Sequence, residues 1–452
     1  MNRSLFLGGC LLAAVASCLT FGTIAGASAA EPDRFAIPDR PNVVMIISDD
    51  QAWTDYGFMG HPVIRTPNLD RLAARSRLFT RGYVPSSLCR PSLATMITGL
   101  YPHQHGITGN DPTLPDPKIN SMTGRRLPQY ARYYETLMHR VEVHPTLPRL
   151  LAERGYVSFQ SGKWWEGNFS RGGFSEGMTH GDPTRGGRHG DEGLKIGREG
   201  MGPVFDFIRR AKASEKPFFL WYAPFLPHAP HNPPKRILDR YLALVPSQAV
   251  AQYYAMCEWF DETCGQLLDF LEGEGLASDT LIVYVCDNGW IQDPDKPDHN
   301  FMPRSKRSPY EGGIRTPIMV CRPGKIEPKR DETTLVSSID LAPTILRACG
   351  VPVPPGLPGA DLLDDQALTA RTTLFGETYD HNVADVDHPT KSLQYRWIID
   401  GDWKLIVPAD PAAPPELYHV IQDSHEEHPV DDANLARRLR EKLDAWWDGT
   451  EK

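Results

Sequence analysis

The sequence predicts an α/β fold in which a mixed central sheet is flanked by helices, followed by a small C-terminal antiparallel sheet with a helix. Short apolar runs rich in β-branched residues alternate with segments of helical period, which is typical of a sheet covered by helices. The length of 452 residues exceeds one ordinary domain and suits a large domain followed by a small one.

The first predicted elements are a strand and a helix. Residues 42–47 have the length and β-branched content of a buried strand. Thr66 precedes a proline and is predicted to cap a helix that runs to Phe79, in which Leu69, Leu72 and Leu78 give the helical period.

The later elements of the large domain continue this alternation. Strands are predicted at 156–159, 217–222, 280–285 and 316–320, and helices at 146–153, 251–271 and 338–348. Residues 112–145 and 172–202 are rich in Pro, Gly, Arg and His and are predicted to be long loops that line a site.

A proline-rich stretch at residues 352–358 marks a domain boundary. Beyond it, residues 395–406 are predicted to form a hairpin that turns at Asp-Gly, and residues 433–447 a terminal helix. The predicted domains are therefore a large one over 38–355 and a small α+β subdomain over 356–452.

The N-terminus has the pattern of a signal peptide. Arg3 precedes an apolar run, and Ala27-Ser28-Ala29 resembles a cleavage site, so residues 1–29 are predicted to direct export to the periplasm or the medium. An alternative cleavage box ending at Cys18 would leave a lipid tether. No other apolar stretch approaches the roughly 20 residues of a transmembrane span.

Charge and cysteine content exclude several classes of protein. A net charge of −9 argues against nucleic acid as a partner, because phosphate binding needs a basic face. Outside the leader the six cysteines show no CxxC spacing, so a zinc ribbon is not expected.

Two acidic turns follow predicted strands. Asp49 and Asp50 come directly after the first strand, and Asp287 and Asn288 directly after the strand at 280–285. Ligands gather at the carboxyl ends of strands in open α/β sheets, and Ca²⁺ prefers carboxylate and amide oxygens. The alternative is ordinary turn chemistry.

The segment around Cys89 is unusual. Cys89 precedes Pro91 and Ser92 at a predicted helix start, where the helix field favours anions and is expected to lower the pKa of the thiol. The alternative is a buried structural cysteine.

The sequence Cys-x-Pro-Ser, followed by Thr-Gly-x-Tyr-Pro, resembles the nucleophile segment of the formylglycine-dependent sulfatases in the alkaline phosphatase superfamily. Gly162-Lys163-Trp164, Pro227-His228, and Lys306 before Tyr-Glu-Gly-Gly match further family motifs. The resemblance implies one Ca²⁺ held by Asp49, Asp50, Cys89, Asp287 and Asn288, and catalytic roles for Cys89, Lys163, His228 and Lys306.

The chemistry implied is hydrolysis of a sulfate ester on a small molecule or polysaccharide, with a carbohydrate favoured. The cation, Lys163 and Lys306 would balance the sulfate oxygens. A hydrated formylglycine at position 89 would attack, and Asp50 or a neighbouring metal-bound carboxylate would accept its proton. His228 or Lys306 would protonate the leaving oxygen.

Two positions depart from the family pattern. Leu93 stands where the family has arginine, and Trp165 where it has histidine, so both changes remove polar contacts around Cys89. Arg90, Arg188 and His189 are candidates to fill this gap. The candidate platforms for a sugar or aryl ring are Trp53, Trp164, Trp165 and Trp290.

Two other functions remain open from the sequence. A phosphate or phosphonate ester hydrolase of the same superfamily would need further metal ligands, for which Asp295, Asp298 and His299 are the candidates. A non-catalytic protein that binds sulfated glycans would keep the anion pocket and an unmodified Cys89.

Overall fold

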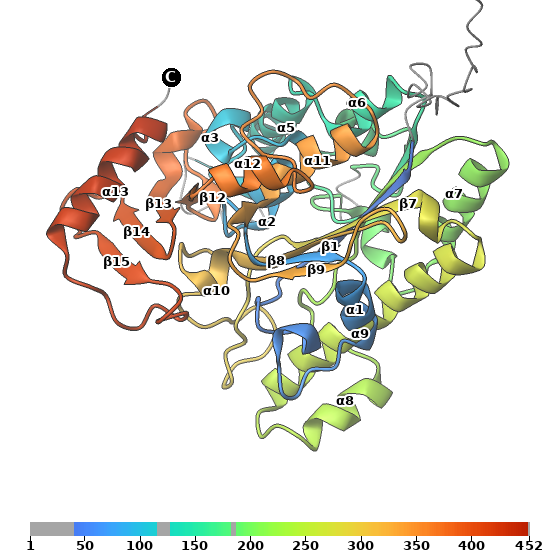
Figure 1. The fold of residues 1–452 in the computed structure, drawn as a ribbon, viewed down its shortest axis with the longest axis horizontal. Helices are drawn as coiled ribbons and strands as arrows, with labels where there is room; N and C mark the ends of the chain where they lie inside the picture. Colours follow the sequence, from blue (N-terminus) through green and yellow to red (C-terminus); the bar gives the residue numbers. More distant parts are fainter. Residues whose placement is uncertain (1–39, 115–126, 182–186, 451–452) are drawn as a thin grey trace, which may run out of the picture. The chain divides into compact units, whose positions relative to one another are not determined.

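A computed structural model describes residues 40–114, 127–181 and 187–450. The predicted signal peptide, residues 1–29, lies outside these ranges. Within them the central sheet has nine strands in the order β10-β2-β8-β7-β1-β6-β4-β5, with β9 beside β2 (Figure 1). The strands are β1 (Asn42–Ser48), β2 (Arg77–Tyr83), β4 (Val157–Gly162), β5 (Glu176–Gly177), β6 (Phe218–Ala223), β7 (Thr280–Cys286), β8 (Arg315–Cys321), β9 (Lys329–Asp331) and β10 (Val336–Ser337).

The sheet is mixed, as predicted. β1 lies between β6 and β7 and is parallel to both, whereas β8 is antiparallel to β7 and to β2. Every residue of β6 and β7 is buried, because a parallel central strand is covered on both faces and needs a continuous apolar run.

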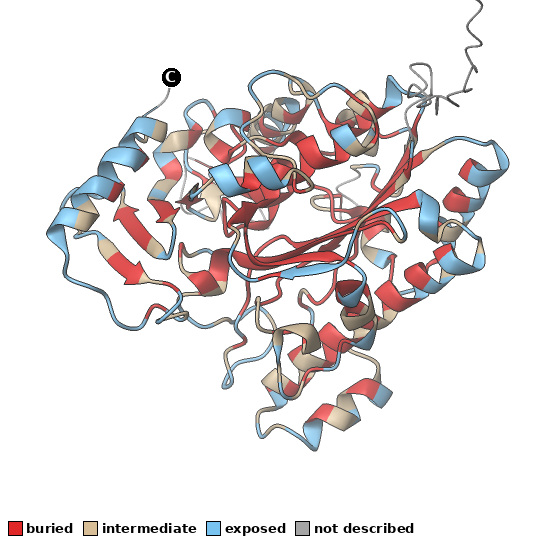
Figure 2. Cartoon of the chain, in the orientation of Figure 1, coloured by how far each residue is buried: buried red, intermediate tan, exposed pale blue. Residues whose placement is uncertain are grey.

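Helices cover both faces of the sheet. Side chains from α2, α6 and α11 pack into one apolar core and those from α1, α7 and α9 into the other, so that buried residues line the sheet and exposed residues face outward (Figure 2). The helices are α1 (Pro67–Ala74), α2 (Cys89–Thr98), α3 (Pro102–His105), α5 (Pro128–Glu142), α6 (Leu147–Ala152), α7 (Gly202–Ala213), α8 (Lys235–Leu242), α9 (Gln248–Gly273), α10 (Glu311–Ile314), α11 (Leu341–Ala348) and α12 (Asp365–Ala370). Short 3₁₀ helices are η1 (Gly57–Met59), η2 (Phe169–Gly172), η4 (Asp191–Lys195), η5 (Ala277–Asp279), η6 (Ser338–Asp340) and η7 (Pro389–Ser392).

The prediction of one helix over 66–79 was wrong at its end. α1 stops at Ala74, and Leu78 and Phe79 belong to β2. β2 pairs with β8, and all its residues are buried. Cross-strand pairing and burial therefore outweigh the local leucine spacing.

The prediction of a loop over 112–145 was also wrong in part, because α5 occupies Pro128–Glu142. Its buried residues Tyr130, Leu137 and Val141 lie on one face of the helix, and Arg132 and His139 are exposed. Because the segment is rich in polar residues, its helical period was not recognised in the sequence.

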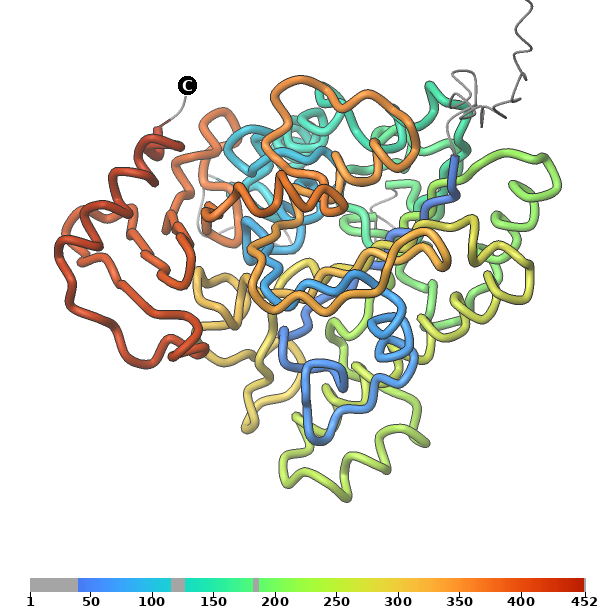
Figure 3. The backbone as a smooth tube through the Cα atoms, in the orientation of Figure 1, coloured from blue at the N-terminus to red at the C-terminus, as the bar shows by residue number. Residues whose placement is uncertain are grey.

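The C-terminal part is an antiparallel sheet with a helix, as predicted. Its order is β11-β13-β14-β15, and α13 packs on it through Leu439 and Leu443. Gly401, with a φ of 60°, makes the turn between β13 and β14. Figure 3 shows this red end of the chain gathered beside α10. The bounds are β11 (Thr373–Tyr379), β13 (Leu393–Asp400), β14 (Trp403–Pro408), β15 (Glu416–His419) and α13 (Ala433–Trp446).

Residues 39–452 form one compact unit, and the predicted division at residue 355 stays a prediction. A parallel bridge of two short strands, β3 (Asp111–Pro112) and β12 (Asn382–Val383), joins an early loop to the segment after β11. Within the described ranges no helix is long and apolar enough to cross a membrane.

A buried ionic cluster joins the C-terminal sheet to α10. Lys404 on β14 lies 3.2 Å from a carboxylate oxygen of Glu311 and 2.8 Å from one of Glu426, and all three side chains are buried. Burial, reinforced by the charge of Glu311, raises the pKa of Glu426 to about 7, although Lys404 opposes the shift.

This cluster predicts a pH dependence of stability. Between about pH 4.5 and 7 the folded chain holds a proton on Glu426 that the unfolded chain has lost, so the free energy of unfolding falls as the pH rises through this window. Glu426→Gln removes this titration, and urea unfolding from pH 5 to 7 should show a flatter profile than wild type. Glu427→Gln, at an exposed neighbour, is the control. Identical slopes in the two variants would contradict the assignment.

Candidate active site

The two acidic turns lie side by side at the carboxyl ends of β1 and β7. The strands pair in register from Asn42 with Thr280 to Ser48 with Cys286. The amide of Asp50 donates to Asp287 Oδ1 at 3.1 Å, and Asn288 Nδ2 donates to Asp50 Oδ1 at 2.7 Å. These bonds help hold Asp50 at a φ of 64°, which is rare outside glycine. Strand pairing therefore brings the two predicted acidic turns together.

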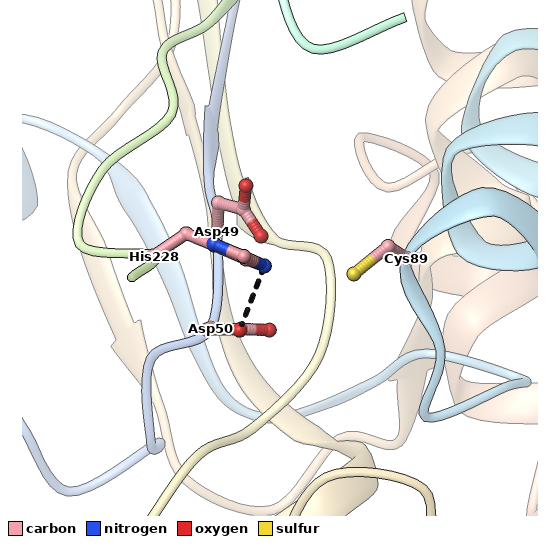
Figure 4. Close-up of side chains that lie close together, drawn as sticks. All are labelled: Asp49, Asp50, Cys89 and His228. Atoms are coloured by element: carbon pink, nitrogen blue, oxygen red, sulfur yellow. Dashed lines mark ion pairs between the residues drawn. The ribbon is translucent and has the colours of Figure 1, made fainter. Parts of the chain in front are cut away.

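Cys89 reaches the same point from α2. Its Sγ lies 3.5 Å from Asn288 Oδ1 and accepts a hydrogen bond from Lys306 Nζ at 3.2 Å. Figure 4 shows the sulfur directed toward Asp49, Asp50 and His228 from the opposite side. The potential ligand atoms of these four residues all lie within 4.8 Å of one another.

The expected low pKa of the Cys89 thiol was wrong. Cys89 is the first residue of α2, but complete burial raises its pKa to about 12, and Lys163 and Lys306 offset only part of this shift. Desolvation of a thiolate therefore outweighs the favourable field of the helix end. Pro91 is the third helical residue rather than the first.

Two buried lysines neutralise two of the carboxylates. Lys163 Nζ donates to Asp49 Oδ1 at 2.6 Å, and Lys306 Nζ contacts both Asp50 oxygens at 2.5 and 2.7 Å. Burial disfavours both ammonium groups, but the adjacent carboxylates raise the pKa of each above its ordinary value, so both are charged.

Gly162 places Lys163 at this position. A Cβ on Gly162 would lie 1.8 Å from the carbonyl oxygen of Ala223, and its φ is 82°. Only glycine permits this close approach between β4 and β6. The backbone therefore turns sharply at the end of β4 and carries Lys163 under the two acidic turns.

His228 follows β6 and faces the carboxylates. Its Nδ1 donates to the carbonyl oxygen of Ala229 at 2.6 Å, and its Nε2 lies 3.4 Å from Asp50 Oδ2. The ring stacks on Phe225 with centroids 4.2 Å apart. Burial, followed by the charges of Lys163 and Lys306, places the pKa of His228 well below its ordinary value.

The cluster of carboxylates is suited to bind a cation. Asp49 Oδ2 and Asp287 Oδ2 are buried and have no hydrogen-bond partner in the described part of the chain. Three carboxylates face two lysines, and burial raises the pKa of Asp49 and of Asp287. Carboxylate oxygens with the amide oxygen of Asn288 form the donor set that a hard cation such as Ca²⁺ prefers. The residues present therefore fit the predicted ion.

The residues proposed to compensate for Leu93 have different surroundings. Arg90 is fully buried and donates to both oxygens of Glu166 at 2.8 and 2.6 Å, so it is committed to this ion pair. Arg188 and His189 line the cavity above Cys89. Leu93 itself is buried in the apolar core.

Only two of the four tryptophans predicted as platforms for a ring line the cavity. Trp165 and Trp290 line the cavity, whereas Trp164 is buried in the core and Trp53 lies against the guanidinium of Arg315. Asp295, Asp298 and His299 belong to no group of potential metal ligands in the described ranges, where the one such group is Asp49, Asp50, Cys89 and His228. Asp298 instead accepts a hydrogen bond from the amide of His231.

Asp50, Cys89, Lys163, His228 and Lys306 line one cavity of about 470 Å³, and we call these five side chains its floor. It is lined by Asp50, Cys89, Asn110, Lys163, Trp165, Arg188, His189, Phe225, His228, Ala229, Pro230, Trp290, His299, Phe301, Lys306, Arg307 and His381. Among these residues Asp50 is the one acid. The lining therefore combines basic side chains with aromatic faces.

Sequence reasoning missed Asn110, Arg307 and His381. Asn110 accepts a hydrogen bond from the amide of Arg90 through Oδ1, and its Nδ2 donates to His381 Nε2 at 3.2 Å. His381 reaches the cavity because β12 pairs with β3, which no local pattern indicates. Arg307 directly follows Lys306, so its place in the cavity could have been inferred from its neighbour in the sequence.

The fold and the site together define a hydrolase of anionic esters with an alkaline-phosphatase-like architecture. Residues 41–351 match the family model described as Sulfatase, and residues 298–448 match the one described as N-sulphoglucosamine sulphohydrolase, C-terminal. The chain belongs to the sulfatase family, which makes it a sulfuric ester hydrolase.

Individual relatives agree with this assignment. The chain is 29% identical to N-acetylgalactosamine-6-sulfatase of Canis lupus familiaris over 78% of its own length and 71% of that protein. It is 28% identical to arylsulfatase A of Homo sapiens over 87% and 84%. The solved structure of BT4656 with D-glucosamine-2-N,6-O-disulfate shares the fold, with a TM-score of 0.69 at 19% identity, over 91% of this chain and 98% of that one.

Proposed function

We propose that this sulfatase hydrolyses a sulfate ester on a carbohydrate, using a formylglycine derived from Cys89 and one Ca²⁺. The observation that carries the proposal is the convergence of Cys89, two buried lysines and three carboxylates, of which Asp50 lines the cavity. We also propose that residues 1–29 direct export, which leaves the lipid tether as an alternative.

Asp49, Asp50, Asp287 and Asn288 would hold the cation, together with the residue at position 89. The bound cation would neutralise the sulfate oxygens. A hydrated aldehyde at position 89 would supply an in-line nucleophile and a second hydroxyl through which sulfate can leave.

The chain's own side chains would perform the remaining tasks. Lys163 and Lys306 present ammonium groups to the sulfate oxygens, where fixed charges act in a desolvated site. Asp50 accepts the proton of the nucleophile. Lys306 contacts both Asp50 and position 89, and it donates a proton to the leaving oxygen; His228 packs the floor against Phe225.

One experiment distinguishes the proposed sulfatase from a non-catalytic binding protein and from a phosphate or phosphonate ester hydrolase. The chain is made in its own host, the peptide containing Cys89 is analysed by mass spectrometry, and hydrolysis of 4-nitrophenyl sulfate and 4-nitrophenyl phosphate is measured. An aldehyde with sulfate release supports the proposal. A free thiol throughout, with binding but no turnover, indicates a non-catalytic glycan-binding protein. A dominant phosphatase or phosphonatase activity indicates the other branch of the superfamily.

Metal removal provides a separate prediction. Without a cation the unpartnered oxygens of Asp49 and Asp287 repel each other in a buried site, so dialysis against EGTA should abolish turnover and lower the melting temperature. Ca²⁺ should restore both, measured by differential scanning fluorimetry and by hydrolysis of 4-nitrophenyl sulfate. Unchanged melting and activity after verified removal would contradict the assigned ligand set.

A further inference from the structure

The cavity contains a second group of cationic side chains beyond its floor. Lys163 and Lys306 are each matched by a carboxylate at the floor. Arg188 and Arg307 line the same cavity and take no part in those ion pairs. Arg188 is paired with Asp111, which does not line the cavity, so Arg307 is the side chain that adds positive charge not neutralised at the floor.

Arg188 is held rigidly on the cavity wall. Its Nε donates to both carboxylate oxygens of Asp111 at 2.9 and 2.8 Å, and its guanidinium lies 4.4 Å from the centre of the Trp165 ring. A guanidinium has five N–H donors, and Nε and one terminal nitrogen are used here in the described part of the chain. The remaining donors are fixed in direction and available to a ligand.

Arg307 is presented by an unusual backbone. Its φ is 65°, and its amide donates to the carbonyl oxygen of Ser87 at 2.9 Å, next to the start of α2. A non-glycine residue at such a φ costs about 1–3 kcal/mol, and such residues gather at functional sites. Its exposed side chain makes no ion pair with any residue of the described ranges.

His381 completes this side of the cavity from the C-terminal part of the chain. Its Nε2 accepts from Asn110, so its Nδ1 carries the proton and can donate. The pairing of Asn382 with Asp111 places His381 beside the partner of Arg188. Arg188, Arg307 and His381 come from three separate segments and all line the cavity, and the charges of both arginines act on His381. Trp290 and Phe301 line the cavity from the hairpin after β7.

We propose that Arg188, Arg307 and His381 form a subsite for a second sulfate group on the same saccharide. Donors from three chain segments suit the three terminal oxygens of a sulfate better than the two oxygens of a planar carboxylate, which one guanidinium satisfies. The substrate is then a saccharide with at least two sulfates, one cleaved at the floor and one held by this subsite. This inference rests on the proposed function of the floor.

Binding to the full-length chain tests the subsite independently of turnover. Isothermal titration calorimetry would compare inorganic sulfate, D-glucosamine 6-sulfate and D-glucosamine 2-N,6-O-disulfate. The disulfate should bind wild type about tenfold more tightly than the monosulfate, as expected for one additional charge-assisted contact. Arg307→Gln should remove about that tenfold advantage and leave the monosulfate and inorganic sulfate within about twofold.

Two further variants control for the loss of a positive charge and test the role of the planar guanidinium. Lys296→Gln, at an exposed lysine of the same hairpin that does not line the cavity, should bind all three ligands like wild type. Arg188→Lys keeps a charge beside Asp111 but loses the planar fork, and it should weaken the disulfate alone.

The failures of the two proposals differ. If wild type binds the monosulfate and the disulfate equally, or if Arg307→Gln weakens both equally, the second subsite is overturned while the floor stands. If neither inorganic sulfate nor either sugar binds wild type, the anion site at the floor fails, and the subsite fails with it.

Discussion

Lys306→Ala is expected to lower kcat for hydrolysis of 4-nitrophenyl sulfate by about 10²–10³-fold, the loss typical of one fixed donor at developing charge. Nζ of Lys306 contacts both oxygens of Asp50 and lies 3.2 Å from the sulfur at position 89. It therefore acts on the reacting atoms. The effect should appear mainly in kcat, because the interaction strengthens as charge develops.

A stability measurement must accompany this variant, because Lys306→Ala leaves Asp50 buried without its closest cation. The variant should unfold cooperatively, with a lower melting temperature that added Ca²⁺ partly restores. Lys325→Ala, at an exposed lysine, is the control for loss of a positive charge and should retain wild-type kcat. A kcat within threefold of wild type for folded Lys306→Ala would contradict the role proposed for Lys306.

The sequence alone was sufficient to predict the two acidic turns of the site, each of which directly follows a strand. Asp49, Asp50, Asp287 and Asn288 each follow a buried strand, and because carboxyl ends of parallel strands share an edge, their meeting follows from a local rule. Lys163 directly follows β4 and His228 follows β6, so both also lie near the carboxyl ends of parallel strands, whereas Lys306 lies in a long connection before β8. The resemblance to a family was nevertheless what singled out all three, since an isolated lysine or histidine carries little spatial information.

Other features depend on tertiary contacts that no local pattern reports. The first three residues of β2 were predicted as helix from leucine spacing, which is a weak signal beside pairing with β8. His381 enters the cavity through a pairing of two-residue strands. The pKa of Cys89 was predicted in the wrong direction because the helix end is visible in sequence, whereas complete burial is a property of the folded chain.

The pair of Arg90 and Glu166 gives the largest expected change in stability. Arg90 follows Cys89 on α2 and Glu166 follows Trp165 after β4, and both side chains are almost fully buried. Arg90 also lies over the ring of Tyr134, 5.1 Å from its centre. Arg90→Met is expected to lower the free energy of unfolding by about 3–5 kcal/mol, because it strands the carboxylate of Glu166 without a partner.

The double variant Arg90→Met, Glu166→Met separates a buried charge from lost packing. It should recover most of the stability in urea unfolding, since two apolar side chains of similar size can replace a buried ion pair. Arg236→Met, which breaks the exposed pair with Glu262, should cost no more than about 1 kcal/mol. If the double variant is as unstable as the single one, packing rather than charge governs this site. Because the pair joins the start of α2 to the turn that carries Trp165, a stable double variant with reduced kcat would show that the pair positions residue 89 for reaction.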